Sequence, residues 1–353
     1  MAYLRNTWYM AAWSYEVADN LLQRKLLDEA VLLYRGDNGD LIAVSNMCPH
    51  RFAPLHLGQI VDGAIECPYH GLRFNSEGRC VFNPDGDGRL PAGARLKTFP
   101  ITERWGCAWI WMGDVEKADP ALIPTFEFLD DPEHYRPVTG LLNVRANYRY
   151  ITDNLMDHAH LLTVHHDTLS SDIMTRAKTI MVREPDGAIW SNRFGANGMP
   201  SKIFDMMWHM ARGDYKGTMD SWAECRWNAP SLVINYVGVT LHGHPREDGI
   251  ETRNSHFLTP ETETTTHYFW STTRDFSLDN PTLDEEIRKG TEYAFIHEDE
   301  VMLHALQEAM AGREFWSMKP ALLQADVSAV EVRRNLDRMI AVEQTATEQA
   351  SAA

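Results

Sequence analysis

Short apolar and β-branched runs, separated by turn residues, dominate the chain from its start to about residue 113. Residues 29–35 (EAVLLYR) and 41–44 (LIAV) flank the turn-forming segment 36–40 (GDNGD), which predicts a β-hairpin. Residues 107–112 (CAWIWM) predict a further strand, closed by the Gly-Asp pair at 113–114. These patterns predict an all-β region.

The pattern changes after this region. Segment 114–124 is rich in Asp, Glu, Ala and Pro, and Pro120 and Pro124 cannot continue a helix or a central strand. The 353 residues exceed one average domain, and 44% hydrophobic residues can fill two cores. We therefore expect two domains, 1–115 and 116–353.

The second part of the chain mixes strands with helices. Residues 175–275 predict a series of strands, residues 148–165 a helix, and residues 283–308 and 327–347 two long helices. The small, polar tail 345–353 is expected to fray. Strands followed by long helices place the chain in the α+β class.

Charge and composition exclude several partners. The formal charge of −17 argues against nucleic acid and anionic membranes, because a polyanion would be repelled. No apolar run approaches the roughly 20 residues that span a bilayer, and no signal peptide is evident, so a cytoplasmic location is expected. The odd total of five cysteines argues against a disulfide framework. Cys80, Cys107 and Cys225 are expected to be small buried side chains.

Two short motifs carry metal-ligand side chains. Cys48-Pro-His50 and Cys67-Pro-Tyr-His70 each offer one thiolate and one imidazole, and sixteen residues separate them. Structural zinc also uses two cysteines and two histidines, but zinc fingers usually pair Cys with Cys and His with His. One of each per loop fits a Rieske [2Fe–2S] cluster, in which two thiolates hold one iron and two imidazoles the other.

A second group of possible ligands lies between residues 153 and 165. On a helix, Asp153, Asp157 and His160 would fall within about 60° of one another, so two carboxylates and an imidazole would converge. His165 would lie roughly 140° away from His160. The helix must therefore end or distort between them if both bind one metal.

Two imidazoles and one carboxylate leave coordination positions open, which lets Fe(II) take up O₂ beside a substrate. Surface histidines on a helix are the alternative, but a redox cluster in the same chain needs an electron acceptor, which favours iron. Spacing alone leaves the remaining ligands open among His158, His165 and His166, and among Asp284, Glu285, Glu298, Asp299 and Glu300.

The chain resembles the Rieske-type non-haem iron aromatic-ring oxygenases. The resemblance rests on residues 48–55 (CPHRFAPL) and 67–74 (CPYHGLRF) and extends over nearly the whole chain. Segments 153–157 (DNLMD), 257–261 (FLTPE) and 268–270 (YFW) are similar to the vanillate O-demethylase and dicamba monooxygenase group. This resemblance implies an N-terminal all-β Rieske domain and a C-terminal helix-grip (START-like) catalytic domain with an antiparallel sheet and long helices.

The resemblance also implies roles for individual residues. His160, His165 and Asp299 would bind the mononuclear Fe(II). Asp157 would link a histidine on this iron to a Rieske histidine of the neighbouring subunit in a ring-shaped homotrimer, which offers a short route for an electron. Asn154 would lie close to the iron and orient bound O₂ or water; an ordinary helix asparagine bonded to the backbone is the alternative.

The reaction that the resemblance implies is oxidative O-demethylation of a methoxylated aromatic acid, with release of formaldehyde. Hydroxylation of an aryl methyl group or an aromatic ring, or electron transfer without catalysis, are the alternatives. The chain has neither a Gly-X-Gly-X-X-Gly nucleotide loop nor a four-cysteine ferredoxin pattern. We therefore expect a separate NAD(P)H-dependent reductase, with or without ferredoxin.

Two polar residues are candidates for substrate contacts. Asn235 shares the apolar face of segment 231–239 with Val233, Val237 and Val239, and a polar group on such a face needs a partner. His256 matches a substrate-contacting histidine of the similar enzymes. The partner of either could be a substrate carboxylate or phenol, or simply the backbone of the core. Candidates for the rest of the cavity wall are Leu162, Met206, Met207 and Trp208.

Overall fold

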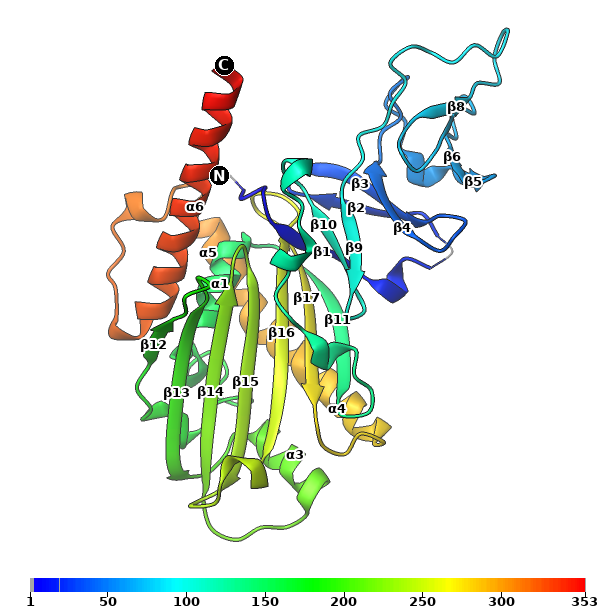
Figure 1. Ribbon diagram of the computed structural model, residues 1–353. Coiled ribbons are helices and arrows are strands. Elements are labelled where there is room, and N and C mark those ends of the chain that lie inside the picture. Colours follow the sequence, from blue (N-terminus) through cyan, green and yellow to red (C-terminus); the bar gives the residue numbers. More distant parts are fainter. Residues whose placement is uncertain (1–2, 19, 353) are drawn as a thin grey trace. The chain divides into compact units, whose positions relative to one another are not determined.

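The computed structural model describes residues 3–18 and 20–352, and contacts divide these residues into two compact units. Of the described residues, unit 1 contains 3–124 and 259–263, and unit 2 contains 125–258 and 264–352. Figure 1 shows the elements of both units in sequence colours.

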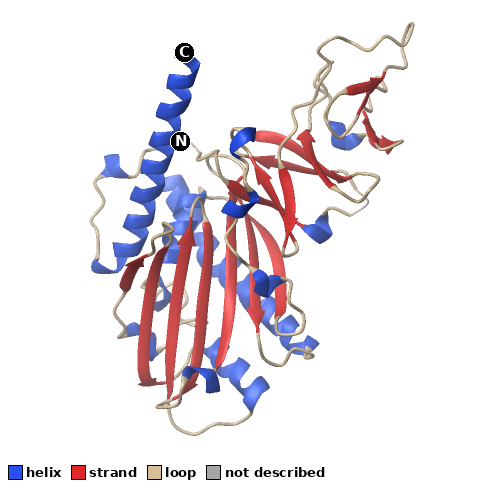
Figure 2. Cartoon of the chain, in the orientation of Figure 1, coloured by secondary structure: helices blue, strands red, loops and turns tan. Residues whose placement is uncertain are grey.

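Unit 1 is built from small antiparallel sheets, shown as short red arrows in Figure 2. Within its described residues the strand orders are β1-β10-β9, β2-β3-β4 and β5-β6-β7-β8. The strands are β1 (Trp8–Trp13), β2 (Leu22–Leu26), β3 (Glu29–Arg35), β4 (Leu41–Ser45), β5 (Gln59–Val61), β6 (Ala64–Glu66), β7 (Arg73–Phe74), β8 (Cys80–Phe82), β9 (Ile101–Arg104) and β10 (Cys107–Trp111). The predicted hairpin is confirmed, because β3 pairs with β4 and Arg35 lies opposite Leu41. The strand predicted at 107–112 is β10.

Unit 2 contains a seven-stranded antiparallel sheet in the order β11-β17-β16-β15-β14-β13-β12 among its described residues. Its strands are β11 (Arg136–Val144), β12 (Ile180–Arg183), β13 (Ile189–Gly198), β14 (Met219–Asn228), β15 (Leu232–Leu241), β16 (Ile250–Pro260) and β17 (Thr266–Arg274). Its helices are α1 (Tyr148–Met156), α2 (Asp172–Thr175), α3 (Lys202–Arg212), α4 (Pro281–Tyr293), α5 (Glu300–Met310) and α6 (Val327–Ala352). Helices α1, α4 and α5 lie behind the sheet in Figure 1. The α+β class with an antiparallel sheet and long helices is confirmed.

The helix predicted over 148–165 is wrong beyond Met156, where α1 ends. Asp157 adopts an extended backbone, and its carboxylate accepts a hydrogen bond of 2.7 Å from the Ala159 amide. The His160 ring donates through Nδ1 to the Asp157 carbonyl. These local side-chain bonds replace the helical ones, and they end the helix four residues before His160, the first histidine of the pair.

The helix predicted over 283–308 exists, but a π-helical turn, Ala294–Asp299, separates α4 from α5. The helix predicted over 327–347 is confirmed as α6, and the tail expected to fray continues this helix as far as Ala352. Residue 353 lies outside the described residues. Of the helices that the structure describes, none combines the length and the apolar character needed to cross a membrane.

Candidate functional site

The two Cys-His loops of unit 1 share one backbone conformation. The Phe52 amide donates to the Cys48 carbonyl at 2.8 Å, and the Gly71 amide donates to the Cys67 carbonyl at 3.0 Å. The fourth residue after each cysteine is left-handed, with φ of 60° at Phe52 and 70° at Gly71. Two matching turns therefore bring their cysteines and histidines to the same end of the unit.

The thiols of this site lie inside and the imidazoles outside. Cys48 and Cys67 are 1% and 2% exposed within an apolar core, whereas His50 and His70 are exposed and their ring centroids lie 4.5 Å apart. Burial raises the pKa of the Cys48 thiol to about 11, and the neighbouring Cys67 thiol adds to this. Since both cysteines are free, a positively charged metal cluster is the natural partner for two adjacent buried thiolates.

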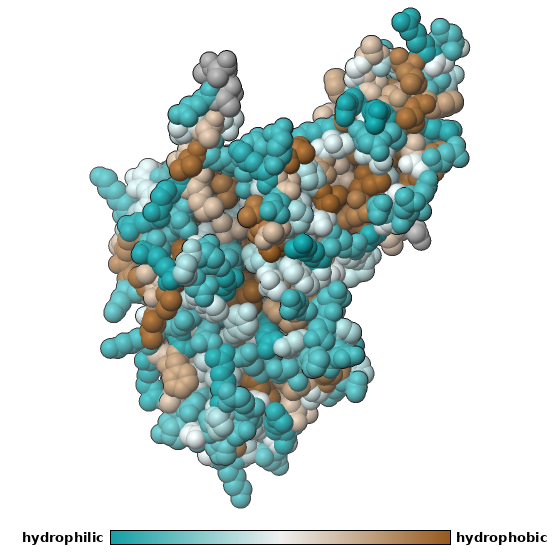
Figure 3. All heavy atoms as spheres, viewed as in Figure 1, coloured by the Kyte–Doolittle hydropathy of each residue, from teal (hydrophilic) through white to brown (hydrophobic). Residues whose placement is uncertain are grey.

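Apolar side chains close in sequence to the two histidines are exposed as well. Met47, Phe52, Leu57 and Tyr69 are between 46% and 69% exposed. Figure 3 shows brown, apolar atoms on the surface of the part of unit 1 that β5 to β8 form. An exposed apolar patch beside candidate redox ligands is a surface that a protein partner could cover.

In unit 2, Asp299 lies beside His160 and His165, although it is far from both in the chain. Their ligand atoms all lie within 4.8 Å of one another. Asp299 Oδ1 is 3.1 Å from His165 Nε2 and 3.7 Å from His160 Nε2. His160 begins a short 3₁₀ turn, His160–Leu162, and Asp299 ends the π-helical turn. A π-helical turn inside a helix often lies at a functional site, and this π-helical turn presents the Asp299 carboxylate to two imidazoles.

Each imidazole is held through its Nδ1 atom. Glu298 Oε2 accepts from His165 Nδ1 at 2.7 Å, and it also accepts from the Thr168 hydroxyl at 2.7 Å. His160 Nδ1 donates to the Asp157 carbonyl. Both Nε2 atoms therefore face Asp299, and the bonds at Nδ1 select the tautomer in which Nε2 can bind a metal.

The pKa values of the two imidazoles are shifted in opposite directions. Burial lowers the pKa of His160, against the attraction of Asp299. At His165 burial also opposes the charge, but the carboxylates of Asp299 and Glu298 outweigh it and raise the pKa. A metal ion bound here would therefore compete with a proton for the Nε2 atom of His165, because the same carboxylates favour either positive charge.

The neighbouring polar residues take different places. Asn154 donates from Nδ2 to Asp299 Oδ1 at 3.0 Å, so it contacts the candidate ligand set. The predicted convergence of two carboxylates is wrong for Asp153, because Asp153 forms an ion pair with Arg333 of α6. Asp157 stays beside His160 but holds it by its backbone carbonyl, while its carboxylate caps Ala159.

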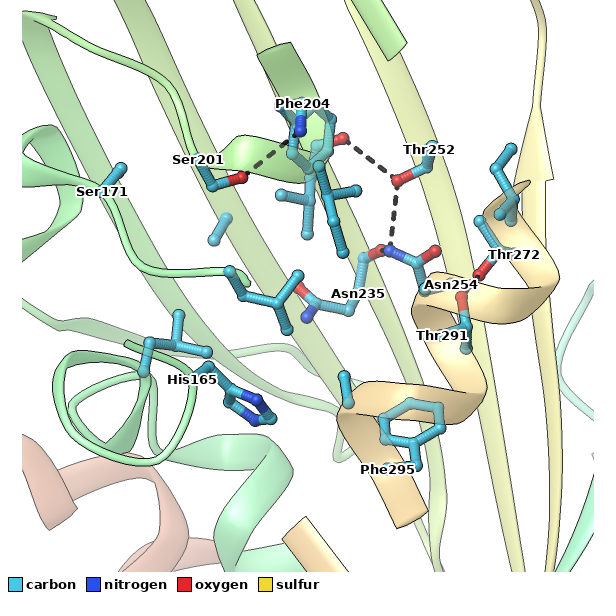
Figure 4. A pocket seen from close by; sticks show the side chains of 18 of the residues that line it. His165, Ser171, Ser201, Phe204, Asn235, Thr252, Asn254, Thr272, Thr291 and Phe295 are labelled. Atoms are coloured by element: carbon cyan, nitrogen blue, oxygen red, sulfur yellow. Dashed lines mark hydrogen bonds between the residues drawn. The ribbon is translucent and has the colours of Figure 1, made fainter. Parts of the chain in front are cut away.

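A cavity of about 290 Å³ opens onto the three candidate ligands. Its wall is mainly apolar, and Figure 4 shows Asn235 and Asn254 reaching into it from the sheet, with His165 and Phe295 at its border. Of the predicted wall residues, Met206 and Met207 line the cavity, whereas Trp208 and Leu162 are not among its lining residues.

Both predicted substrate contacts line this cavity. Asn235 lies on β15, and its Oδ1 atom is buried without a hydrogen-bond partner among the described residues. His256 lies on the adjacent strand β16; its Nδ1 atom is 2.8 Å from the Tyr268 hydroxyl, and its Nε2 atom is buried without a partner there. Burial lowers the pKa of His256 to about 3, so the ring is neutral at physiological pH.

Comparison with known proteins agrees with this geometry. Residues 7–100 match the Rieske [2Fe-2S] domain, and residues 144–342 match the vanillate O-demethylase oxygenase C-terminal domain. The chain is 42% identical to the chloroacetanilide N-alkylformylase oxygenase component of Rhizorhabdus wittichii, over 97% of both chains. It is 39% identical to the dicamba O-demethylase oxygenase component of Stenotrophomonas maltophilia, over 96% of this chain and 98% of that one. The chain belongs to the Rieske non-haem iron oxygenases.

The solved structures support the same assignment for this Rieske oxygenase. A crystal structure of dicamba monooxygenase bound to 3,6-dichlorosalicylic acid superposes with a TM-score of 0.91 at 38% identity, covering 98% of this chain and 99% of that chain. Another is described with non-haem iron and dicamba, at a TM-score of 0.83 and 36% identity, covering 98% of this chain and 99% of that chain. Two thiols with two imidazoles suit the [2Fe–2S] cluster of this family, and two imidazoles with a carboxylate suit its iron.

Sequence reasoning missed the roles of two residues of this oxygenase site. Glu298 was one of several candidate ligands, but it holds His165 instead. His158 was considered only as a candidate metal ligand, yet it is 4% exposed and lines the cavity. The local signal for His158 was weak, because the expected helix ends before it.

Proposed function

We propose that this oxygenase removes the methyl group of an aromatic methyl ether by oxidation. One atom of O₂ enters the methyl C–H bond, and two electrons and two protons reduce the other atom to water. The hydroxylated methyl ether is a hemiacetal, which breaks its C–O bond to give a phenol and formaldehyde. The observation that carries this proposal is the mainly apolar cavity that ends on His160, His165 and Asp299.

In this proposal the protein holds the metals and aims the substrate. Cys48, His50, Cys67 and His70 hold the [2Fe–2S] cluster, and His160, His165 and Asp299 hold Fe(II), which supplies O₂ activation when bound. The apolar wall excludes water from the reacting carbon. Asn235 and His256 fix the orientation of the ring, so that the methyl group points at the ligand triad.

Asn154 and Asp157 act on the ligand set. The Asn154 amide donates to Asp299 and fixes which carboxylate oxygen faces the histidines. The Asp157 carbonyl fixes the His160 ring, and we propose that its carboxylate meets a Rieske histidine of the neighbouring subunit in a homotrimer. This places one residue between an electron store and the site that consumes the electron.

The names of the relatives bear on the reaction. They include dicamba and vanillate O-demethylases, a chloroacetanilide N-alkylformylase and a toluene-4-sulfonate monooxygenase. The first three kinds are named for loss of a group from oxygen or nitrogen, which favours dealkylation. Hydroxylation of an aryl methyl group, or of a ring, is the second candidate, and it is favoured by the toluene-4-sulfonate relative at 36% identity.

Electrons come from a separate protein in this proposal. Several relatives are named as oxygenase components or subunits, which implies a partner. We propose an NAD(P)H-dependent reductase, with or without a ferredoxin, that docks on the exposed apolar side chains around His50 and His70.

The test is reconstitution of the purified chain with a reductase and a panel of aromatic methyl ethers. The proposal predicts formaldehyde and phenol in equal amounts, together with coupled O₂ uptake. Aryl-methyl or ring hydroxylation would instead leave every carbon in the product. A chain that only carries electrons would bind two irons instead of three, and its function would survive His160→Ala.

A further inference from the structure

Gly290 of α4 is a helix-interior residue that lines the cavity, and no step of the proposed function uses it. Glycine is among the least favourable residues inside a helix, because it loses the most backbone freedom on folding. The φ of Gly290 does not lie in the left-handed region, and an added Cβ would lie 3.5 Å from Ile203 Cδ1, an ordinary contact distance. Neither backbone conformation nor close packing therefore requires glycine here, and the absent side chain leaves space beside the cavity.

The sheet shows how far this cavity extends from the ligand triad. His256, Asn254 and Thr252 of β16 all line it, because alternate residues of a strand point to the same face. The His256 ring lies 5.8 Å from the ring of Phe295, which belongs to the same π-helical turn as Asp299. At about 3.3 Å per residue, Thr252 lies about 13 Å farther along the strand than His256.

Helix α4 extends over a similar length on the opposite wall. Phe295, Thr291 and Gly290 line the cavity in succession, and Figure 4 shows Thr291 and Phe295 on this helix. At about 1.5 Å per residue, Gly290 lies roughly 13 Å from Asp299 along the helix axis. Both walls therefore continue well beyond the triad.

The part of the cavity farthest from the triad, which we call the distal compartment, is mainly apolar. Val237 of β15 lies opposite Thr252 of β16 and opposite Ala223 of β14. Ile203 of α3 and Gly290 of α4 complete the compartment, and all five residues line the cavity. An uncharged, apolar group fits such a wall, because burial of apolar surface is favourable and burial of an unpaired charge is costly.

The charged residues near this compartment belong to its solvent edge. Glu286 and Lys289 also line the cavity, but they form an ion pair with each other at 3.3 Å. Their side chains are 43% and 61% exposed. This pair therefore marks the place where the cavity meets solvent.

We propose that Gly290 is a specificity-determining residue, which keeps the distal compartment open for a second apolar group, about the size of a ring, on the side of the substrate opposite the methoxy group. A single ring whose methoxy carbon faces the triad is shorter than the cavity and leaves this compartment unfilled. A larger side chain at position 290 would close the compartment. This inference rests on the proposed function, which sets the direction in which the substrate lies.

The test uses two probes that differ in one group: 2-methoxybenzoate and 2-methoxy-5-phenylbenzoate. The phenyl group is para to the methoxy group, so it points away from the triad when the methyl group faces the triad. The dissociation constants are measured with the anaerobic holoenzyme, so that no turnover occurs. We expect the phenyl compound to bind about tenfold tighter, because it buries a second ring. Equal or weaker binding of the phenyl compound would overturn the inference.

Gly290→Leu introduces a good helix former whose side chain fills the distal compartment. The ratio of the two dissociation constants should shift about tenfold in favour of the one-ring probe, and the urea midpoint of the ligand-free protein should rise. Glu285→Leu, at an exposed position of α4, is the matched control and should keep the ratio of the parent. An unchanged ratio in Gly290→Leu would contradict the proposed role.

Gly290→Ala decides the question if the leucine variant folds poorly. Its Cβ fits at an ordinary contact distance, so the protein should fold with a higher urea midpoint than the parent. The ratio should shift in the same direction by a smaller factor. A ratio equal to that of the parent would show that the glycine does not set the size of the substrate.

Formaldehyde release separates this inference from the proposed function. If the phenyl compound binds in the distal compartment but yields no formaldehyde, the reaction is wrong and the compartment stands. If both probes yield formaldehyde and the Gly290 variants keep the parent ratio, the compartment is wrong and the reaction stands.

Discussion

The two metal sites are built in opposite ways. In unit 1, two loops with the same turn supply all four candidate ligands between Cys48 and His70. In unit 2, Asp299 joins two histidines more than a hundred residues earlier in the chain, and it does so from a π-helical turn. The first site depends on the local backbone geometry of two loops. The second site forms only when segments distant in the chain pack against one another. A substitution in one loop of unit 1 should therefore affect only the site that this loop forms, whereas the site of unit 2 should also depend on the contacts that hold its ligands.

Removal of a ligand gives the largest effect. His160→Ala should abolish turnover and lower the iron content from about three to about two atoms per chain, while the Rieske signal in electron paramagnetic resonance persists. Cys67→Ser should remove the Rieske signal and leave the mononuclear iron. Loss of both centres in either variant would contradict the independence of the two sites.

Removal of a supporting contact should give the next largest effect. Glu298→Gln replaces the carboxylate that accepts from His165 Nδ1, and we expect iron affinity to fall about 10–100-fold. Iron affinity is measured by competition with a chelator. Glu308→Gln, on the exposed face of α5, is the matched control and should leave the affinity unchanged. Equal affinities in the two variants would show that the distant site needs no such support.

The cavity wall should make stability depend on pH. His256 has a folded pKa of about 3, whereas an unfolded imidazole titrates near 6.5, so the unfolded chain binds the proton first as the pH falls. This ring therefore leaves the free energy of unfolding unaffected above about pH 6.5, and it lowers that free energy by about 2 kcal/mol between pH 7 and pH 5. Between pH 7 and pH 5, the free energy of unfolding of His256→Gln, measured with urea, should therefore fall by about 2 kcal/mol less than that of the parent. A variant with the acid sensitivity of the parent would contradict the neutral buried ring.

The loop site offers the smallest effect and the sharpest comparison. Gly71→Ala places a Cβ at φ +70°, 3.0 Å from Pro84 Cγ, and Gly86→Ala places one at φ +59° in open space. Each should cost about 1–2 kcal/mol of stability through its backbone conformation. Only Gly71→Ala should also shift the Rieske spectrum, because its loop carries His70. A shift in both variants would mean that the spectrum follows overall stability instead of the loop.

The sequence predicted the local features of this protein best. The hairpin of β3 and β4, the α+β class and helix α6 could be read from periodicity and turn residues, because each depends on neighbouring positions. The buried state of Cys80, Cys107 and Cys225 was also predicted correctly.

The features that failed depend on tertiary packing. Helical geometry placed Asp153 with His160, but Arg333 of α6 attracts Asp153 and the chain leaves the helix after Met156. Glu298 and Asp299 are adjacent, and only the π-helical turn decides which carboxylate faces the histidines and which holds His165. His158 became visible as a pocket residue only after the break in α1 turned its ring into the cavity wall.

The most direct test of the account is a reaction of the reconstituted enzyme under ¹⁸O₂ with an aromatic methyl ether, followed by mass spectrometry of the phenol. Attack at the methyl carbon predicts a phenol without ¹⁸O, and one formaldehyde for each O₂ consumed. A phenol that contains ¹⁸O, or a hydroxylated product that keeps its methoxy group, would contradict it.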